Sequence, residues 1–584
     1  MMETLQNFIF PESEQFGSRE KYFRASFDGG ISENKLQMAN ASSVVFDTYY
    51  NAFSIPLWRE RVGLSQANLL MSGSGKVTVA LCQFTETGES ILQKKEIDLS
   101  PKDVSVFEQS LSEAEGLIYP RITATHGAAS ITAMKWASSA PARHQVKLGL
   151  SITTFQRKAF VLPALTRIKE KLLDTAEWRE KIDLIVVDNS SDLTKEETQG
   201  VKVIPNENTG GSGGFMRGFL HYKNETDATH VLFMDDDAAL EMESIKRAYQ
   251  ILSFAEKENT AVAAALFYDD APDIFLERGA SVGKYWVKVE FQKENATDVD
   301  TVLKTEQKWA QETPKTAFAG WWFNAFPIKS VKHLVPPFFV RSDDMAFAQF
   351  NDFNLIWANG IASYAEDFQK KMTAMTTYLD ARNMLLYDAL FSSRILSDSY
   401  YIAMNRLVSL LSARYEHHQL ERMALNDFLN MTPEKWIESA SLKEKLPEVN
   451  AMIKNERLKP VDYDTSGFVS VDAKAESTLK SLLRMIFLPR KNRTVKSEYL
   501  MLPHFNQLAG SKRIFYYLGD KAFIVTVKPW KLFSGLCLLA VDSLRLIFGF
   551  KKVKARLLAK FDALTSEAMW QEIFSGGGQD VDKH

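Results

Sequence analysis

The spacing of apolar and polar positions changes twice along the 584-residue chain. Between about residues 20 and 136, short apolar runs are separated by Gly, Asn and Ser, which is typical of β-strands. Val77–Phe84 and Ala129–Trp136 are two such runs. Many short strands predict an N-terminal β-sandwich or jelly-roll domain over residues 1–140. The stretch Ala137–His144, rich in Ser, Ala and Pro, predicts the linker that follows.

From Val146 onward, strand patterns alternate with helical patterns, which predicts a parallel α/β sheet over residues 141–390. The expected strands are Val146–Ile152, Ile182–Val187, Val201–Ile204 and His230–Met234, and the expected helices are Ala159–Leu173 and Ser212–Tyr222. In sheets of this kind, ligands bind beyond the carboxyl ends of the strands. We therefore look for functional residues directly after these strands.

The last third of the chain has helical spacing, and residues 391–584 are predicted to form a C-terminal helical domain. Tyr378–Leu429 has long apolar periodicity without Gly or Pro. Trp530–Phe550 is mostly apolar and is followed by the basic residues Lys551, Lys552, Lys554 and Arg556. This segment predicts either a buried core helix or a helix at a membrane surface.

Composition narrows the classes of function. Hydrophobic residues make up 45% of the chain and charged residues 24%, as in globular proteins. A net charge of −3 gives no bulk attraction to nucleic acid, so no nucleic-acid partner is expected. The two cysteines, Cys82 and Cys537, exclude a disulfide framework, and the N-terminus lacks the pattern of a signal peptide. A cytoplasmic location is the expectation.

Three adjacent carboxylates, Asp235, Asp236 and Asp237, directly follow the fourth predicted strand. Such a run is unfavourable unless a cation neutralises it, and hard oxygen ligands suit Mg²⁺ or Mn²⁺. Asp235 and Asp237 alternate, so one can reach a ribose while the other binds the metal. The alternative is a solvated acidic turn.

Polar loops follow the other strands. Thr153–Arg157 follows the first strand and Asp188 ends the second. The glycine-rich segment Asn206–Arg217 begins a helix, where backbone N–H groups can approach an anion closely. A flexible loop is the alternative for this segment.

A fourth group combines aromatic and acidic residues. Trp321 and Trp322 lie beside a glycine and can form an apolar platform for a sugar face. Asp343 and Asp344 follow on a predicted loop, where one carboxylate can act as a general base toward an acceptor hydroxyl. The alternatives are core aromatics and an N-cap for the helix Met345–Phe350.

In order and spacing, these motifs resemble the bacterial galactofuranosyltransferases of the GT-A fold, in glycosyltransferase family 2, particularly the bifunctional mycobacterial polymerases that build galactan. The matching pieces are Thr154–Arg157, Asp188, Asn208–Phe215, Met234–Asp237, Trp321-Trp322, Asp343-Asp344 and, nearer the N-terminus, Phe46–Phe53 with Trp58. The resemblance extends from about residue 20 to 390. It implies a GT-A, Rossmann-like central domain that transfers galactofuranose from UDP-galactofuranose to a cell-surface glycan with inversion.

The resemblance also implies roles for individual residues. The implied donor site consists of Thr154, Arg157, Asp188, Asn208, Gly210, Gly211, Gly213 and Asp235. Asp235 and Asp237 would hold Mn²⁺ or Mg²⁺, Asp344 would be the base, and Asp343 with Trp321 and Trp322 would bind the acceptor. The implied partners are a UDP-sugar and a glycan or lipid-linked glycan acceptor at the inner face of the cell membrane. The sequence leaves open whether the N-terminal domain binds the acceptor or mediates self-association into a homo-oligomer.

One position departs from the family pattern. The family has a metal-binding histidine in a Trp-His-Glu type motif, and Ala365 stands at that position in Ser363–Phe368. An alanine cannot ligate a metal. Glu366 or water could replace the ligand, metal binding could be weaker, or a histidine has been exchanged here. Two other functions therefore stay open: a GT-A transferase for another nucleotide sugar such as rhamnose, and a non-catalytic glycan-binding protein.

Overall fold

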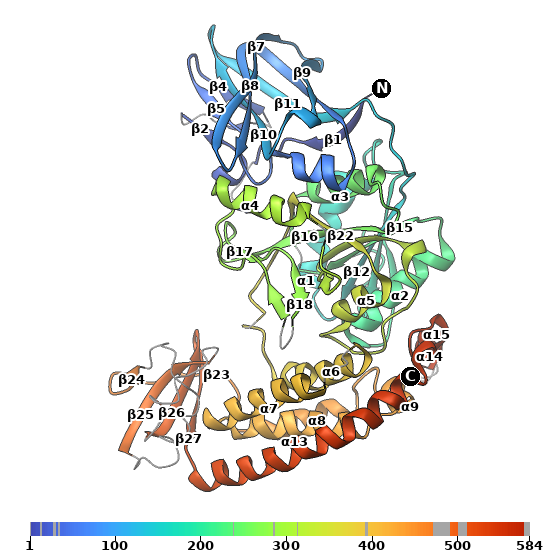
Figure 1. Ribbon diagram of the computed structural model, residues 1–584, viewed down its shortest axis with the longest axis vertical. Helices are drawn as coiled ribbons and strands as arrows, with labels where there is room; N and C mark the ends of the chain where they lie inside the picture. Colours follow the sequence, from blue (N-terminus) through green and yellow to red (C-terminus); the bar gives the residue numbers. More distant parts are fainter. Residues whose placement is uncertain are drawn as a thin grey trace.

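The computed structural model describes residues 2–11, 15–26, 31–32, 35–237, 239–283, 287–311, 313–368, 370–391, 395–470, 491–499, 508 and 511–576. Three tiers follow one another along the molecule (Figure 1). An all-β region lies at one end, an α/β region lies in the middle, and a long helical region with a small sheet lies at the other end.

A single long strand organises the N-terminal region. The strand β7 (Gln66–Thr85) pairs antiparallel with four other strands. Its first half pairs with β9 (Val104–Ser110) and β11 (Ala129–Ser138), and its second half with β8 (Gly88–Leu99) and β10 (Leu117–Ala124). The shorter strands are β1 (Glu3–Asn7), β2 (Arg24–Ala25), β3 (Ile31–Ser32), β4 (Lys35–Met38), β5 (Ser43–Val45) and β6 (Phe53–Ser54). The region is all-β as expected, while the narrower assignment to a jelly roll is not confirmed.

The central sheet brings the predicted site residues to one edge. The strands β14 (Lys202–Pro205), β13 (Ile182–Asp188), β12 (Leu148–Thr154) and β15 (His230–Asp235) lie side by side and run parallel. In this register Thr154 lies opposite Asp188, and Thr153 lies opposite Asp235. The sheet continues through β21 (Phe323–Pro327), β16 (Thr260–Tyr268), β17 (Phe275–Glu277) and β22 (Asn354–Ala365).

Five helices accompany the central sheet, among the residues that the structure describes (Figure 1). They are α1 (Lys158–Ile168), α2 (Gly210–Glu225), α3 (Met242–Phe254), α4 (Val299–Ala310) and α5 (Asp343–Asn351). A small antiparallel sheet contains β18 (Ala280–Val282), β19 (Val287–Val289) and β20 (Ala317–Phe318). The predicted strands and helices therefore lie within a few residues of their expected bounds.

The C-terminal region is helical, as expected. Its helices are α6 (Ala374–Phe391), α7 (Ile395–Leu411), α8 (Tyr415–Leu429), α9 (Pro433–Glu438), α10 (Lys445–Met452), α13 (Pro529–Leu558), α14 (Phe561–Leu564) and α15 (Glu567–Gly576). Because α6 begins at Ala374, the predicted border at residue 390 falls near the end of this helix. The expected Tyr378–Leu429 run includes residues 392–394, which lie outside the described part of the chain.

The C-terminal region also holds a sheet that the sequence pattern did not predict. Its strands are β23 (Lys459–Pro460), β24 (Val469–Ser470), β25 (Lys491–Glu498), β26 (Ser511–Leu518) and β27 (Lys521–Thr526). The two-residue turn Gly519-Asp520 joins β26 to β27, and Gly519 has φ +57°, which favours glycine. Gly-Asp between two apolar runs is a hairpin signal, so this part was detectable in the sequence.

Buried polar contacts join the all-β region to the central sheet. The Arg247 guanidinium, on α3, donates to the carbonyls of Asn7 (3.1 Å), Tyr50 (2.9 Å) and Asn359 (3.1 Å). The Tyr364 hydroxyl, near the end of β22, lies 2.6 Å from the Tyr50 hydroxyl and accepts from Lys21 Nζ at 2.8 Å. These groups are buried, so each region supplies the hydrogen-bond partners that buried polar groups of the other region need.

Candidate active site

The acidic run lies at the end of β15, where it meets the loop after β12. Thr154 Oγ1 donates to Asp236 Oδ2 at 2.7 Å. Arg157 Nη2 lies 2.7 Å from Asp237 Oδ2, and Arg157 Nη1 lies 3.2 Å from Asp236 Oδ1. A second cation, Lys371, lies 3.0 Å from the same Asp237 oxygen. The predicted residues Thr154, Arg157, Asp235 and Asp237 thus come together at one strand edge.

The three carboxylates of this run differ in their electrostatic surroundings. Burial, and then the charges of Asp237 and Asp236, raise the pKa of Asp235 to about 8. Burial also raises the pKa of Asp236 to about 6. Although burial acts upward on Asp237 too, Lys371 and Arg157 hold the pKa of this carboxyl below its usual value. Asp237 is therefore the carboxylate that the two cations keep ionised.

The Asp188 carboxylate accepts hydrogen bonds from the loop that directly follows it. Its Oδ1 accepts from the Ser190 amide (2.9 Å) and hydroxyl (2.7 Å), and its Oδ2 accepts from the amides of Asp192 and Leu193, both at 2.8 Å. Four hydrogen bonds use the acceptor capacity of a carboxylate. Asp188 therefore shapes the turn after β13, and its contact with a nucleotide stays a prediction.

The glycine-rich segment packs α2 closely against its neighbours. A Cβ on Gly213 would come within 1.8 Å of Thr209 Oγ1, and one on Gly214 within 2.2 Å of Thr153 Cγ2. Gly210 has φ +68°, and a Cβ there would meet the Phe339 carbonyl at 2.2 Å. Gly211 differs, because the nearest heavy atom to its Cβ would lie at 3.7 Å. Gly210, Gly213 and Gly214 are thus required by packing, whereas a Cβ on Gly211 would make only ordinary van der Waals contacts.

Backbone groups at the start of α2 already donate within the protein. The Gly210 amide donates to Asn208 Oδ1 (3.1 Å), the Ser212 amide to the Phe339 carbonyl (3.0 Å), and the Gly213 amide to the Thr209 carbonyl (3.2 Å). This bonding fixes the helix start against the loop before α5. It leaves less of the helix N-terminus open to an anion than the sequence suggested.

Asp343 and Asp344 begin α5 after a strained loop. Phe339, Arg341 and Ser342 have φ values of 77°, 70° and 68°, in the left-handed region that non-glycine residues rarely adopt. The Asn383 side chain on α6 holds this loop by donating to the carbonyls of Val340 (2.7 Å) and Phe338 (2.9 Å). Strain that surrounding contacts maintain in this way is characteristic of functional sites.

The two acids that follow this loop have different neighbours. Asp343 Oδ2 accepts from the Ser212 hydroxyl of α2 at 2.7 Å. Asp344 Oδ1 accepts from the Met345 amide at 2.8 Å. Burial, and then the neighbouring Asp343, raise the pKa of Asp344 to about 7. Asp344 is therefore able to exchange a proton near neutral pH.

One cavity of about 830 Å³ connects the two acid groups, since Asp235, Gly211, Asp343 and Asp344 all line it. Its volume lies within the range of small-molecule sites. The cavity reaches the helical region, where α6, α7 and α8 contribute Asp380, Met384, Asn405, Arg406 and Glu421. It therefore spans from the strand edge to the C-terminal helices.

The predicted tryptophans both border this cavity, with different surroundings. Trp321 is buried and packs edge-on against Phe215 and Phe233, with ring centroids 5.2 Å from each. Trp322 is half-buried and packs against Phe368 at 5.5 Å. Trp322 with Phe368 thus offers the more accessible aromatic surface for a sugar.

Sequence reasoning missed Glu277, Lys371 and Asn383. Glu277 ends β17, lines the cavity, and has a pKa that burial, and then Asp344, raise to about 8. The buried-type neighbours Phe275 and Leu276 were its only signal in the sequence. Lys371 and Asn383 act from segments after β22, and no local pattern indicates where those segments fold.

The residues at the strand edge do not fit the predicted metal site well. Ala365 ends β22 at the family's histidine position and supplies no ligand. Asp237 is already paired with two cations. In the described ranges, no three His, Cys, Asp or Glu side chains are grouped so that they could hold a metal ion. The cofactor Mn²⁺ or Mg²⁺ stays a prediction from the acidic run and from the resemblance.

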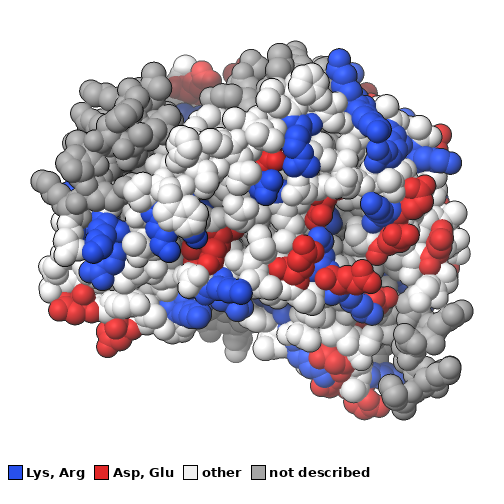
Figure 2. All heavy atoms as spheres, turned by 90° about the horizontal axis from the view of Figure 1, so that it is seen from below, with Lys and Arg blue, Asp and Glu red and all other residues white. Residues whose placement is uncertain are grey.

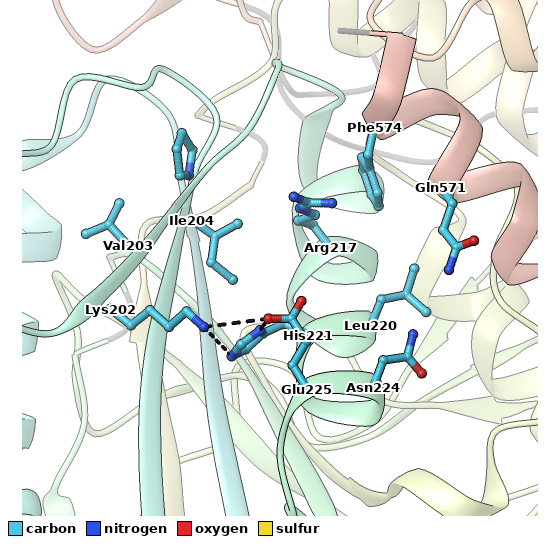
Figure 3. A pocket seen from close by; sticks show the side chains of 11 residues that line it. Lys202, Val203, Ile204, Arg217, Leu220, His221, Asn224, Glu225, Gln571 and Phe574 are labelled. Atoms are coloured by element: carbon cyan, nitrogen blue, oxygen red, sulfur yellow. Dashed lines mark hydrogen bonds and ion pairs between the residues drawn. The ribbon is translucent and has the colours of Figure 1, made fainter. Parts of the chain in front are cut away.

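A second crevice, of about 330 Å³, lies between β14, α2 and α15 (Figure 3). Lys202 Nζ lies 3.2 Å from His221 Nε2, and His221 Nδ1 lies 2.9 Å from Glu225 Oε2. None of the predicted site residues lines this crevice. The predicted site residues that line a cavity therefore lie in the larger one.

Comparison with known families agrees with these features. Residues 150–318, which contain β12–β15 and the acidic run, match the family Glycosyl transferase family 2. Within this range the chain is similar to glycosyltransferase family 2 domains. The family resemblance drawn from the motifs is thereby confirmed.

Two curated proteins that are similar to this chain are both named galactofuranosyltransferase GlfT2. The protein of Mycolicibacterium smegmatis is 25% identical over 439 residues, covering 68% of this chain and 65% of that protein. The protein of Mycobacterium tuberculosis is 23% identical over 455 residues, covering 72% of this chain and 70% of that protein. The chain thus spans slightly less than two thirds of the first relative. Among solved structures, one that is similar is the mannosyltransferase PcManGT of Pyrobaculum calidifontis in complex with GDP-Man and Mn²⁺. The similarity covers 54% of this chain and 83% of that protein, with 15% sequence identity and a TM-score of 0.30.

Proposed function

We propose that this family 2 chain is an inverting glycosyltransferase of the GT-A fold, which moves galactofuranose from UDP-galactofuranose to a hydroxyl of a cell-surface glycan. The observation that carries the proposal is the shared cavity, which holds Asp235 at the strand edge and Asp344 at the start of α5. The family 2 match and the two relatives named galactofuranosyltransferase support the reaction class and the sugar.

The proposed reaction is one displacement at the anomeric carbon. The acceptor oxygen forms a bond to this carbon while the bond to the β-phosphate oxygen breaks, and its electron pair leaves with UDP. Asp344 accepts the proton of the acceptor hydroxyl, which requires an ionised carboxylate. Its raised pKa of about 7 makes it a stronger base than an exposed aspartate, while it still ionises near neutral pH. Asp343, held by Ser212, would orient the acceptor.

The donor would bind at the strand edge. Arg157 carries a positive charge beside the acidic run and is 35% exposed, so it can also contact a diphosphate. Asn208 and Gly211 lie at the start of α2, and Gly211 has room on the cavity side. The half-buried Trp322 would pack against the transferred or accepting sugar.

The donor assignment is tested by transfer assays on the full chain. UDP-galactofuranose, UDP-galactopyranose and dTDP-rhamnose would be offered with a galactofuranosyl acceptor, and product would be measured by mass spectrometry. We expect transfer from UDP-galactofuranose alone. Transfer from dTDP-rhamnose would show another sugar specificity, and no transfer from any donor would favour a non-catalytic glycan-binding protein.

We also propose that α13 holds the protein at an anionic membrane surface, where a lipid-linked acceptor would be available. Leu532, Leu539, Leu546 and Val553 of α13 are buried, while a second apolar stripe on the same helix is exposed and includes Trp530, Phe533, Val541, Leu544 and Phe548. Phe533 and Phe548 are 72% and 81% exposed. Viewed from this end of the molecule, uncharged surface lies beside both basic and acidic side chains (Figure 2).

A surface position suits α13 better than a span. By length and composition it is the one helix in the described ranges that could cross a membrane. However, Asp542 at its centre is buried and pairs with Arg406 of α7 (2.8 Å) and Arg422 of α8 (2.9 Å), which attaches the helix to the protein. An amphipathic helix with basic residues such as Lys551 and Lys552 binds anionic lipid headgroups and buries its exposed apolar stripe.

Vesicle sedimentation tests this placement. We expect the protein to sediment with phosphatidylglycerol vesicles and less with phosphatidylcholine vesicles. The double substitution Phe533→Ser and Phe548→Ser should weaken binding by about tenfold or more, because two large apolar side chains no longer enter the lipid. Ile91→Ser, at a 54% exposed position in the all-β region, is the matched control. Unchanged binding of the double variant would contradict the proposal.

A further inference from the structure

At the cation site that the family resemblance predicts, this chain lacks the histidine ligand and has a lysine ammonium group instead. β22 ends at Ala365, where the resemblance places a metal-binding histidine. Lys371 follows six residues later in the segment after β22, and its Nζ lies 3.0 Å from Asp237 Oδ2. The segment that would present a metal ligand in the family therefore presents a positive charge in this chain.

We propose that Lys371, together with Arg157, supplies the positive charge that offsets the donor diphosphate, so that donor binding and transfer need no divalent cation. This inference rests on the proposed nucleotide-sugar transfer and deepens it. An ammonium and a guanidinium together carry the same formal charge as one Mn²⁺ or Mg²⁺ ion.

The contacts of Asp237 support this assignment. Its Oδ2 accepts from Arg157 Nη2 at 2.7 Å and from Lys371 Nζ at 3.0 Å, and its side chain is only 12% exposed. Charge-assisted bonds at these distances are strong, so an ion that binds this oxygen must first displace them. Asp237 thus acts here as an anchor for two cations.

Both cations remain able to reach a ligand. The Lys371 and Arg157 side chains are each 35% exposed, while the carboxylate between them is nearly buried. An ammonium has three donors and a guanidinium has five, so the bonds to the acidic run leave capacity for oxyanions. Asp235 on the same run lines the cavity, which places this pair beside the proposed donor site.

The transfer step gives these cations a chemical role. As the bond from the anomeric carbon to the β-phosphate oxygen breaks, the UDP leaving group gains one negative charge, and the proton released by the acceptor goes to Asp344. Fixed cations aimed at an oxygen that gains charge stabilise the transition state more than the ground state. Lys371 and Arg157 would provide this stabilisation without an ion from solution.

The test compares UDP binding and transfer by the full chain in EDTA and in Mn²⁺. Calorimetry would measure UDP affinity, and product formation would measure transfer. The variants are Lys371→Met and Lys371→Arg, with Lys370→Met as the matched control. Lys370 Nζ lies 2.6 Å from Asp270 Oδ2, so this neighbouring lysine pairs with an acid outside the run Asp235–Asp237. Thermal unfolding would confirm that each variant is folded.

We expect the unmodified chain to bind UDP equally in EDTA and in Mn²⁺. Lys371→Met should weaken UDP binding in EDTA by about 10- to 100-fold, whereas Lys371→Arg should retain most of the affinity and Lys370→Met all of it. Loss of UDP binding in EDTA with recovery in Mn²⁺ would overturn this inference and leave the proposed function in place. Absence of UDP binding in both conditions would overturn both, and unchanged binding by Lys371→Met would overturn the role of Lys371.

Discussion

Two groups of adjacent aspartates meet at the same cavity, the first through Asp235 and the second through Asp343 and Asp344, and they differ in what surrounds their charge. Arg157 and Lys371 contact the group Asp235–Asp237 directly. The pair Asp343 and Asp344 receives neutral donors, the Ser212 hydroxyl and the Met345 amide. Both groups are largely buried, and burial raises the pKa of Asp235 to about 8 and that of Asp344 to about 7, whereas the pKa of Asp237, which pairs with both cations, lies below its usual value. Burial alone thus does not decide whether a carboxylate is ionised. A nearby positive charge can outweigh the effect of burial, because it stabilises the ionised form.

The difference assigns separate tasks to the two groups. A carboxylate that fixed cations keep ionised is a poor proton acceptor, but it positions those cations beside a ligand. A buried carboxylate without such a partner gains affinity for a proton near neutral pH. The first group therefore suits the donor phosphates, and the second suits the acceptor hydroxyl.

The largest effect is expected from Asp344→Asn, which removes the proton acceptor and retains the shape of the side chain. Transfer should fall by roughly 10²- to 10⁴-fold, the usual contribution of general base catalysis, with UDP affinity unchanged. Steady-state kinetics and calorimetry on one preparation would separate these quantities. Transfer at the unmodified rate would remove Asp344 from the base role.

A smaller effect is expected from Arg157→Met at the other group. Without the guanidinium, UDP affinity should fall by about tenfold or more, because charge-assisted hydrogen bonds to phosphate are lost. Arg179→Met, at an exposed arginine of the same region, is the control. If both variants bound UDP equally well, the assignment of the donor phosphates to the acidic run Asp235–Asp237 and its cations would be contradicted.

The pH dependence of transfer should follow Asp344. A protonated carboxyl cannot accept the acceptor proton, so kcat should be low at acid pH and rise as pH passes through about 7. Asp343→Asn removes the neighbouring negative charge that raises this pKa, so the midpoint of the profile should move to lower pH. A midpoint that stayed in place or moved upward would show that another group controls the rate.

The smallest effect is expected from Glu277→Gln. Glu277 lines the cavity beside the second group, and its pKa of about 8 makes its carboxyl a hydrogen-bond donor at neutral pH. An amide also donates, so we expect the acceptor KM to rise only about 3- to 10-fold, with little change in kcat. Glu277→Ala, which cannot donate, should raise KM further. Equal KM values for both variants and the unmodified chain would place Glu277 outside the acceptor site.

The sequence predicted the first group better than the second. Alternating strand and helix patterns placed Asp235–Asp237 at a strand end, and the register of β12, β13 and β15 brings Thr154, Asp188 and Asp235 to one edge. Such placement follows from local periodicity and the parallel sheet alone. The position of Asp343 beside α2, with Asp344 next to it, depends on the loop that Asn383 holds from α6, and no local pattern encodes that contact.

Residues that act across long sequence distances were missed for the same reason. Lys371 reaches Asp237 from a segment 134 residues away in the chain. Composition was less informative at the glycine-rich segment: it suggested an anion cradle, whereas Gly213 and Gly214 are required by close packing with Thr209 and Thr153, and anion binding there stays a prediction. Composition identifies a residue with conformational freedom, and only the surrounding atoms show how that freedom is used.

The contacts between the all-β region and the central sheet affect how such a chain can evolve. If the central region were expressed from about residue 141, the Arg247 guanidinium would lose two of its three carbonyl partners, those of Asn7 and Tyr50, and Tyr364 would lose Lys21 and Tyr50. Buried polar groups without partners are costly, so the fragment should be unstable on its own. Recombination between genes would then conserve function only when both regions are exchanged together, and the two would be inherited as one unit.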